Sequence, residues 1–227
     1  MSGLVALGDS ITRDGGTPML GLPGRPWVEL LADALGLSCR NLARDGADAG
    51  AVLREQVPEL QGEFDVACLY VGVNDAREPG WDAGAFARDL EAILCALARA
   101  APLVLTATMP EDLGRPTAAP KPRAANAIIR AGAVRHGAVL VALDDLAGRE
   151  LVLPDAVHLT ALGEAEIAVR AAAALRARGV RAPGDVAALA RPDRSRLALA
   201  TWRSRRAQLL AEDLRRRRRE RGLGFDS

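Results

Sequence analysis

The chain has 227 residues, of which 49% are hydrophobic, and it carries a formal net charge of +1. This length suffices for one α/β domain of ordinary size with an appendage. The chain has three cysteines and no recognisable export signal, which argues against a disulfide framework. The apolar stretch near the start is far too short to cross a membrane. We therefore expect a cytoplasmic protein with no transmembrane segment.

Apolar runs alternate with helical patterns along most of the chain. The strands are predicted at residues 3–7, 37–43, 65–72, 102–108 and 138–143. Three of these runs are almost continuously apolar, which is typical of strands buried on both faces, and the second is more polar, which suits an edge strand. Helices are predicted at residues 26–36, 82–100, 122–137 and 160–179, with a weaker one at 47–61 that breaks near Pro58. This alternation predicts a parallel, doubly wound sheet with right-handed crossovers.

The charge is unevenly distributed. Residues 1–190 contain 18 basic and 24 acidic side chains, whereas residues 191–227 contain 12 basic and 5 acidic ones. We therefore expect an α/β domain at residues 1–180 and a basic helical extension at residues 181–227. Two long connections rich in glycine and proline, at residues 12–26 and 109–122, are expected to form functional rims of the domain. Together with residues 75–81, they are expected to shape a substrate pocket.

Polar residues follow four of the predicted strands. In a doubly wound sheet, ligands bind beyond the carboxyl ends of the strands, where the strand order reverses. The residues at these ends are Asp9 and Ser10, Gly46, Asn74, and Asp155 with His158. Because the carboxyl ends of parallel strands meet at one edge, we expect these residues to converge.

The residue types at this edge suit nucleophilic catalysis. A serine hydroxyl such as that of Ser10 needs a base to remove its proton, and His158 is the one histidine in such a loop. Asp155, three residues earlier, is placed to orient the imidazole. The backbone N–H groups of Ser10 and Gly46 and the side-chain amide of Asn74 are candidate donors to an oxyanion.

Four motifs together resemble the SGNH hydrolases, also called the GDSL esterase/lipase family. They are GDSIT with Ser10, NLARDGA with Gly46, GVNDA with Asn74, and DAVHLT with Asp155 and His158. The resemblance spans roughly residues 4–179 and implies a flavodoxin-like αβα sandwich with strand order 2-1-3-4-5. It also implies hydrolysis through an acyl-serine intermediate, in which Ser10 is the nucleophile and His158 the base. Gly72-Val73 stands where the family has two glycines.

The leading hypothesis is therefore a serine esterase that acts on small acyl esters or thioesters and needs no cofactor or metal. Asp9, Asp75 and Trp81 are candidate substrate contacts, although a core position suits Trp81 equally well. One alternative is a metal-assisted hydrolase, whose ligands would come from Asp9, Asp14, Asp144, Asp145 and His158.

A second alternative is a binding module whose basic tail contacts nucleic acid or an anionic membrane. The arginines of the tail have no interleaved aromatic residues, and nearby acids dilute their charge. We therefore expect no stable complex with nucleic acid. The tail could equally dock on the acidic domain.

Overall fold

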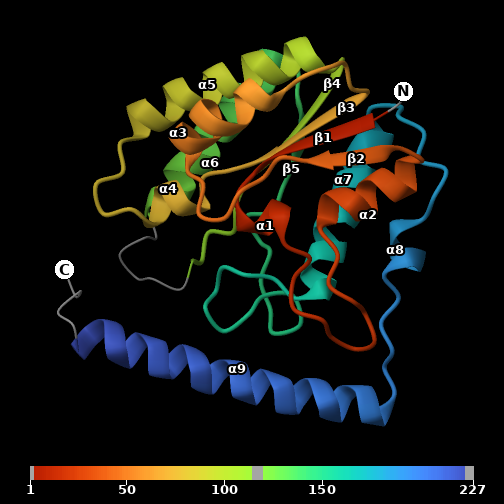
Figure 1. Cartoon of the computed structure of the whole chain (residues 1–227), viewed down its shortest axis with the longest axis vertical. Coiled ribbons are helices and arrows are strands. Elements are labelled where there is room, and N and C mark those ends of the chain that lie inside the picture. The colour runs from red at the N-terminus through yellow and green to blue at the C-terminus, as the bar shows by residue number, and fades with distance from the viewer. Residues whose placement is uncertain (1–2, 114–119, 223–227) are drawn as a thin grey trace.

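The computed structural model of the chain describes residues 3–113 and 120–222 and contains one five-stranded sheet (Figure 1). All four pairs of neighbouring strands are parallel, in the order β2–β1–β3–β4–β5. The strands are β1 (Gly3–Gly8), β2 (Ser38–Asn41), β3 (Val66–Tyr70), β4 (Leu103–Ala107) and β5 (Val139–Val141). The predicted flavodoxin-like fold and strand order are confirmed.

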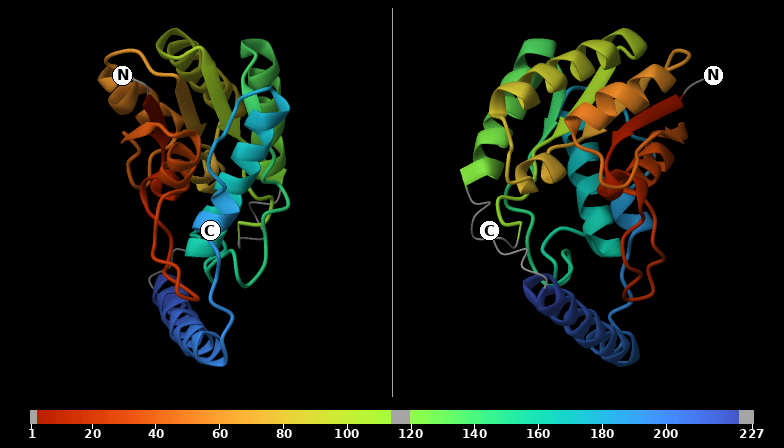
Figure 2. Two further views of the ribbon diagram at one scale, coloured as in Figure 1. Left: turned by 90° about the vertical axis from the view of Figure 1, so that its right-hand side faces the viewer. Right: turned by 60° about the vertical axis from the view of Figure 1, so that its left-hand side comes forward.

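Helices cover both faces of the sheet (Figures 1 and 2). Helices α2 and α7 pack together on one face, and α3, α5 and α6 lie on the other. The helices are α1 (Ser10–Arg13), α2 (Trp27–Leu35), α3 (Ala49–Ala51), α4 (Val73–Arg77), α5 (Ala83–Ala100), α6 (Pro120–His136), α7 (Ala161–Ala177), α8 (Val186–Leu189) and α9 (Arg196–Gly222). The four main predicted helices are confirmed as α2, α5, α6 and α7, and each begins and ends within two residues of its predicted range.

The predicted signals at the helix ends have their expected geometry. The Asp82 carboxylate accepts hydrogen bonds from the first free backbone N–H groups of α5, and the Thr160 hydroxyl accepts one from α7. Gly36 ends α2 in the left-handed conformation, with φ of 71°. The strands divide as predicted, since β1 and β3 are wholly buried whereas β2, at the edge, is partly exposed.

The weak helix predicted at residues 47–61 is an irregular helical path. After α3 the chain forms a π-helical turn at Val52–Gln56 and a 3-10 turn at Val57–Glu59, which contains Pro58. The π turn directs the Gln56 side chain into the core, where it is fully buried. There its amide exchanges two hydrogen bonds with the backbone of Gly8, at 2.9 Å from the Gly8 nitrogen and 2.8 Å from its oxygen.

Gly8 is required at the end of β1. Its φ of 154° is rarely adopted by other residues, and a Cβ atom there would lie 2.4 Å from the Tyr70 carbonyl oxygen. Gln56 and Gly8 therefore fix the last residue of the strand that leads to Ser10.

The extension crosses the edge of the domain where the strands end. Helix α9 lies beneath the loops at the carboxyl edge of the sheet (Figure 1). Trp202 of α9 is buried in a small apolar cluster with Met19, Leu20, Leu22 and Ala161. Across the two described ranges, no helix is both long and apolar enough to span a membrane.

We predict that Gln56→Ala lowers the free energy of unfolding by about 1–3 kcal/mol for each backbone group of Gly8 that loses its partner. Urea denaturation followed by circular dichroism measures this loss. Gln61→Ala is the matched control, because Gln61 is exposed and should cost less than about 0.5 kcal/mol. Equal stability of the two variants would contradict the structural role of Gln56.

Candidate active site

Ser10 lies at the junction of β1 and α1. Asp9 is the N-cap of α1, and its Oδ1 accepts a hydrogen bond of 2.9 Å from the backbone N–H of Ile11. Because Asp9 is buried, this cap holds the start of α1 firmly against the end of the strand. Ser10 is therefore presented at the carboxyl edge of the sheet, in the first turn of a helix.

Asp155 and His158 lie in the loop between β5 and α7 and are directly bonded. The Asp155 Oδ2 atom lies 2.6 Å from His158 Nδ1. Its Oδ1 atom accepts the backbone N–H groups of Val157 and His158, both at 3.0 Å. Between them, Ala156 has a φ of 61°, a conformation that is uncommon for residues other than glycine. The carboxylate thus holds both the imidazole and a strained turn in place.

The two side chains shift each other's pKa in opposite directions. The hydrogen bond with Asp155 raises the pKa of His158, although burial of the ring opposes this effect. Burial raises the pKa of Asp155, but hydrogen bonds from the His158 ring and the backbone outweigh it and lower the pKa to about 2. The Asp155 carboxylate is therefore ionised near neutral pH, where it stabilises a protonated imidazole.

The second ring nitrogen of His158 faces the serine. His158 Nε2 lies 3.5 Å from the Ser10 Oγ atom, although the two residues are 148 positions apart in the chain. This separation is at the upper limit of a hydrogen bond, and such contacts in enzymes commonly shorten when substrate binds. A hydroxyl, an imidazole and a carboxylate consequently form one continuous row.

Asn74 contacts the residue before Ser10 and the residue after Gly46. Asn74, in the first turn of α4, donates from Nδ2 to the Ala47 carbonyl oxygen at 3.0 Å and lies 3.5 Å from Asp9 Oδ2. The Asn74 amide therefore links the turn containing Gly46 to the residue before Ser10. Gly46 has a φ of 69°, a backbone conformation that favours glycine. A Cβ atom at this position would meet no neighbouring atom within 4 Å among the described residues.

Asp9 and Asp75, which were predicted to contact the substrate, are both buried. Burial raises the pKa of Asp9 to about 7 and that of Asp75 to about 6. Both carboxylates bind backbone N–H groups, and Asp75 accepts from Ala49 at 3.1 and 3.2 Å. Asp9 and Asp75 therefore stabilise the neighbouring loops, because their side chains accept hydrogen bonds from backbone N–H groups that would otherwise be buried without a partner.

Trp81, for which a substrate contact and a core position were both predicted, is partly buried. It packs against the main hydrophobic core, and its ring centroid lies 6.1 Å from that of Phe86. Residues 114–119 of the predicted rim at 109–122 lie outside the described residues.

The acids proposed as metal ligands are dispersed. Asp144 binds Arg130 and Thr108, and Asp145 binds Arg170. Within the residues that the structure describes, no group of three or more histidine, cysteine, aspartate or glutamate side chains could hold a metal ion.

The extension contacts the loop leading to Asp155 through partners that the sequence did not indicate. Arg206 of α9 donates to the carbonyl oxygens of Arg149 and Val152, at 2.6 and 3.2 Å. Arg217 donates to the Pro154 carbonyl oxygen at 3.2 Å. The excess positive charge of the tail was the signal for docking on the acidic domain, but hydrogen bonds to backbone carbonyls leave no pattern in the sequence.

A comparison with protein families finds a match to the GDSL-like Lipase/Acylhydrolase family over residues 6–166. A search of curated proteins finds no relative of the chain.

Solved structures with a similar fold include a lipase/acylhydrolase from Enterococcus faecalis, which is 18% identical with a TM-score of 0.60 over 78% of this chain and 97% of that one. A member of the lipolytic G-D-S-L family from Veillonella parvula is 19% identical, with a TM-score of 0.62 over 76% and 97% of the two chains. An acetyl xylan esterase is 21% identical, with a TM-score of 0.59 over 76% and 99%. At these identities the likeness concerns the fold.

We predict that Asp155→Asn lowers the pKa of His158, because the substitution removes the charge that favours the imidazolium. NMR titration of the imidazole resonances measures the change. In the unaltered protein the pKa of His158 should lie above the ordinary value of a histidine side chain. The second histidine signal, from His136 bonded to Glu91, should be unchanged by the substitution. An unchanged or higher pKa of His158 in the variant would contradict the contact with Asp155.

Proposed function

The chain belongs to the GDSL-like Lipase/Acylhydrolase family, and from this premise we propose that it is a serine hydrolase that cleaves carboxylic esters or thioesters through an acyl-serine intermediate. The observation that carries the proposal is the row formed by Ser10, His158 and Asp155, with contacts of 3.5 and 2.6 Å. Similar structures that are described as a lipase/acylhydrolase and as an acetyl xylan esterase support ester cleavage as the reaction class.

Ser10 is the nucleophile in the first half of the reaction. Its Oγ attacks the ester carbonyl carbon while His158 Nε2 accepts the hydroxyl proton. Asp155 favours this transfer, because its carboxylate stabilises the imidazolium and fixes the tautomer in which Nε2 is free to accept. When the tetrahedral intermediate collapses, the imidazolium returns the proton to the departing alcohol or thiol, and the acyl group remains on Ser10.

Water completes the cycle in the second half. His158 takes a proton from a water molecule as that water attacks the acyl carbonyl carbon. The second tetrahedral intermediate then releases the carboxylic acid, and His158 returns the proton to the Ser10 oxygen. The same imidazole thus acts as base and acid in both halves.

Three donors stabilise the negative charge that develops on the carbonyl oxygen. They are the backbone N–H groups of Ser10 and Gly46 and the side-chain amide of Asn74. The amide of Asn74 has two hydrogens, and Ala47 accepts one of them at 3.0 Å. Among the described residues, the other printed contact of this nitrogen is the distant Asp9 Oδ2 at 3.5 Å, and this weak contact supports a role for the amide at the oxyanion.

We expect Ser10→Ala to reduce kcat/KM for p-nitrophenyl acetate by at least about 10⁴-fold, because no other group replaces the attacking oxygen. Release of p-nitrophenolate measures the rate. Ser204→Ala provides the matched control, since Ser204 lies exposed on α9 and its loss should leave the rate unchanged. Substantial activity in Ser10→Ala would remove this serine from the mechanism.

A further inference from the structure

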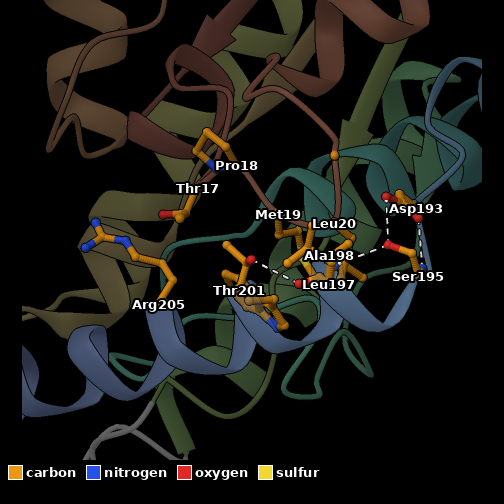
Figure 3. Close-up of a pocket in the computed structure, with 12 residues that line it drawn as sticks. Thr17, Pro18, Met19, Leu20, Asp193, Ser195, Leu197, Ala198, Thr201 and Arg205 are labelled. Carbon is orange, nitrogen blue, oxygen red and sulfur yellow. Dashed lines mark hydrogen bonds between the residues drawn. The ribbon is translucent and has the colours of Figure 1, made fainter.

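A cavity of about 570 Å³ lies between residues 17–21 and helix α9 (Figure 3). Its floor is apolar and buried, formed by Met19, Leu20 and Trp202, which are 4%, 3% and 6% exposed. The volume falls within the range of about 300–1,000 Å³ that is usual for small-molecule sites. Neither Ser10 nor His158 lines this cavity, so it is distinct from the catalytic row.

One wall is a tight turn that presents Leu20 to the helix. Met19 and Leu22 exchange backbone hydrogen bonds of 3.2 and 2.8 Å, and the two residues between them, Leu20 and Gly21, have φ values of 50° and 77°. Positive φ at both central positions defines a type I′ turn. This conformation is unfavourable for leucine, and burial of the Leu20 side chain beneath α9 offsets its cost.

The other wall is α9, which several contacts hold in place. The backbone N–H of Asp193, just before the helix, donates to the Leu20 carbonyl oxygen at 2.7 Å. Arg194 binds the Glu150 carboxylate at 3.2 and 3.0 Å through its two terminal nitrogens. Helix α9 begins well beyond residue 166, where the family match ends, so this wall is an addition outside the matched domain.

The Thr17 end of the cavity is near the catalytic row. The backbone N–H of Thr17 donates to the Leu159 carbonyl oxygen at 3.0 Å, and Thr17 forms a parallel bridge with Thr160. Bridged residues lie about 5 Å apart, and His158 is two residues from Thr160. The Cα atoms of Thr17 and His158 are therefore separated by no more than about 12 Å.

The lining indicates an uncharged, apolar ligand. Asp193 and Arg205 are the charged residues among those that line the cavity, and both are exposed. The Asp193 carboxylate already binds the backbone N–H and the hydroxyl of Ser195, at 2.8 and 3.1 Å. The Arg205 guanidinium can remain in water while its methylene groups cover an apolar ligand.

We propose that this cavity binds the distal part of a long acyl chain whose ester group lies at Ser10. The assignment rests on the proposed function and specifies its substrate class: esters of fatty acids long enough to extend from the catalytic row past Thr17. Each methylene group that leaves water favours binding about fourfold. A long chain therefore gains affinity that an acetyl group, confined to the catalytic row, does not.

Ala198→Phe tests the assignment, because Ala198 lines the cavity from α9 and a phenyl ring there would occupy part of the space. The quantity to measure is the ratio of kcat/KM for p-nitrophenyl decanoate to that for p-nitrophenyl acetate. We expect the ratio to fall by at least about tenfold, somewhat less than the roughly sixteenfold effect of two buried methylene groups. The control is Ala200→Phe, on an exposed position of the same helix that does not line the cavity, and its ratio should match that of the unaltered protein. An unchanged ratio in Ala198→Phe would overturn the proposal.

A binding measurement separates this assignment from the proposed function. In the Ser10→Ala background, methyl decanoate should alter tryptophan fluorescence in a saturable manner, because Trp202 lines the cavity. The change should be lost in Ser10→Ala/Ala198→Phe and retained in Ser10→Ala/Ala200→Phe. Binding without hydrolysis of any ester by the unaltered protein would contradict the proposed function and leave the cavity assignment standing. Hydrolysis without this binding would overturn the cavity assignment alone.

Discussion

The hydrogen bond between the Asp155 carboxylate and the His158 imidazole is the interaction on which the site depends. It is short, at 2.6 Å, and it shifts the ring toward its protonated form while leaving Nε2 directed at Ser10. Without it, the imidazole could rotate or adopt the other tautomer, and the oriented base that we propose for the Ser10 hydroxyl would be lost. The same carboxylate also binds the backbone of its own loop, so one ionised group sets both the loop and the ring.

Buried polar groups hold the other half of the site. Gln56 binds the last residue of β1, and Asp9 caps the helix that begins with Ser10. Glu164 of α7, also buried, accepts the backbone N–H of Trp27 at the start of α2, at 3.0 Å. Each satisfies a backbone group near a strand or helix end, where regular secondary structure leaves donors and acceptors unpaired. The position of Ser10 is therefore fixed by hydrogen bonds inside the domain.

The sequence was sufficient to predict the sheet, because apolar runs such as Val66–Tyr70 identify strands buried on both faces. It also predicted that Ser10 and His158 would lie close together, since the carboxyl ends of parallel strands share one edge. It could not show which polar residues turn inward. Gln56 follows Arg54 and Glu55 in a pattern that resembles a solvated helix, and only the π turn directs it into the core.

The orientation of Asp9 and Asp75 could not be predicted from the sequence either. A carboxylate at a strand end can face a ligand or bind backbone N–H groups, and its neighbours in the fold determine which of the two it does. The placement of α9 was equally inaccessible. Arginine side chains bound to carbonyl oxygens, and a leucine buried in a strained turn, have no signature in composition or spacing.

Covalent labelling by a fluorophosphonate, followed by mass spectrometry of the peptide at residues 1–13, tests most directly whether Ser10 is an activated nucleophile. We expect the label on Ser10 in the unaltered protein, and we expect labelling to slow by orders of magnitude in His158→Gln. A label on another residue, or equal rates of labelling in the two proteins, would contradict this expectation.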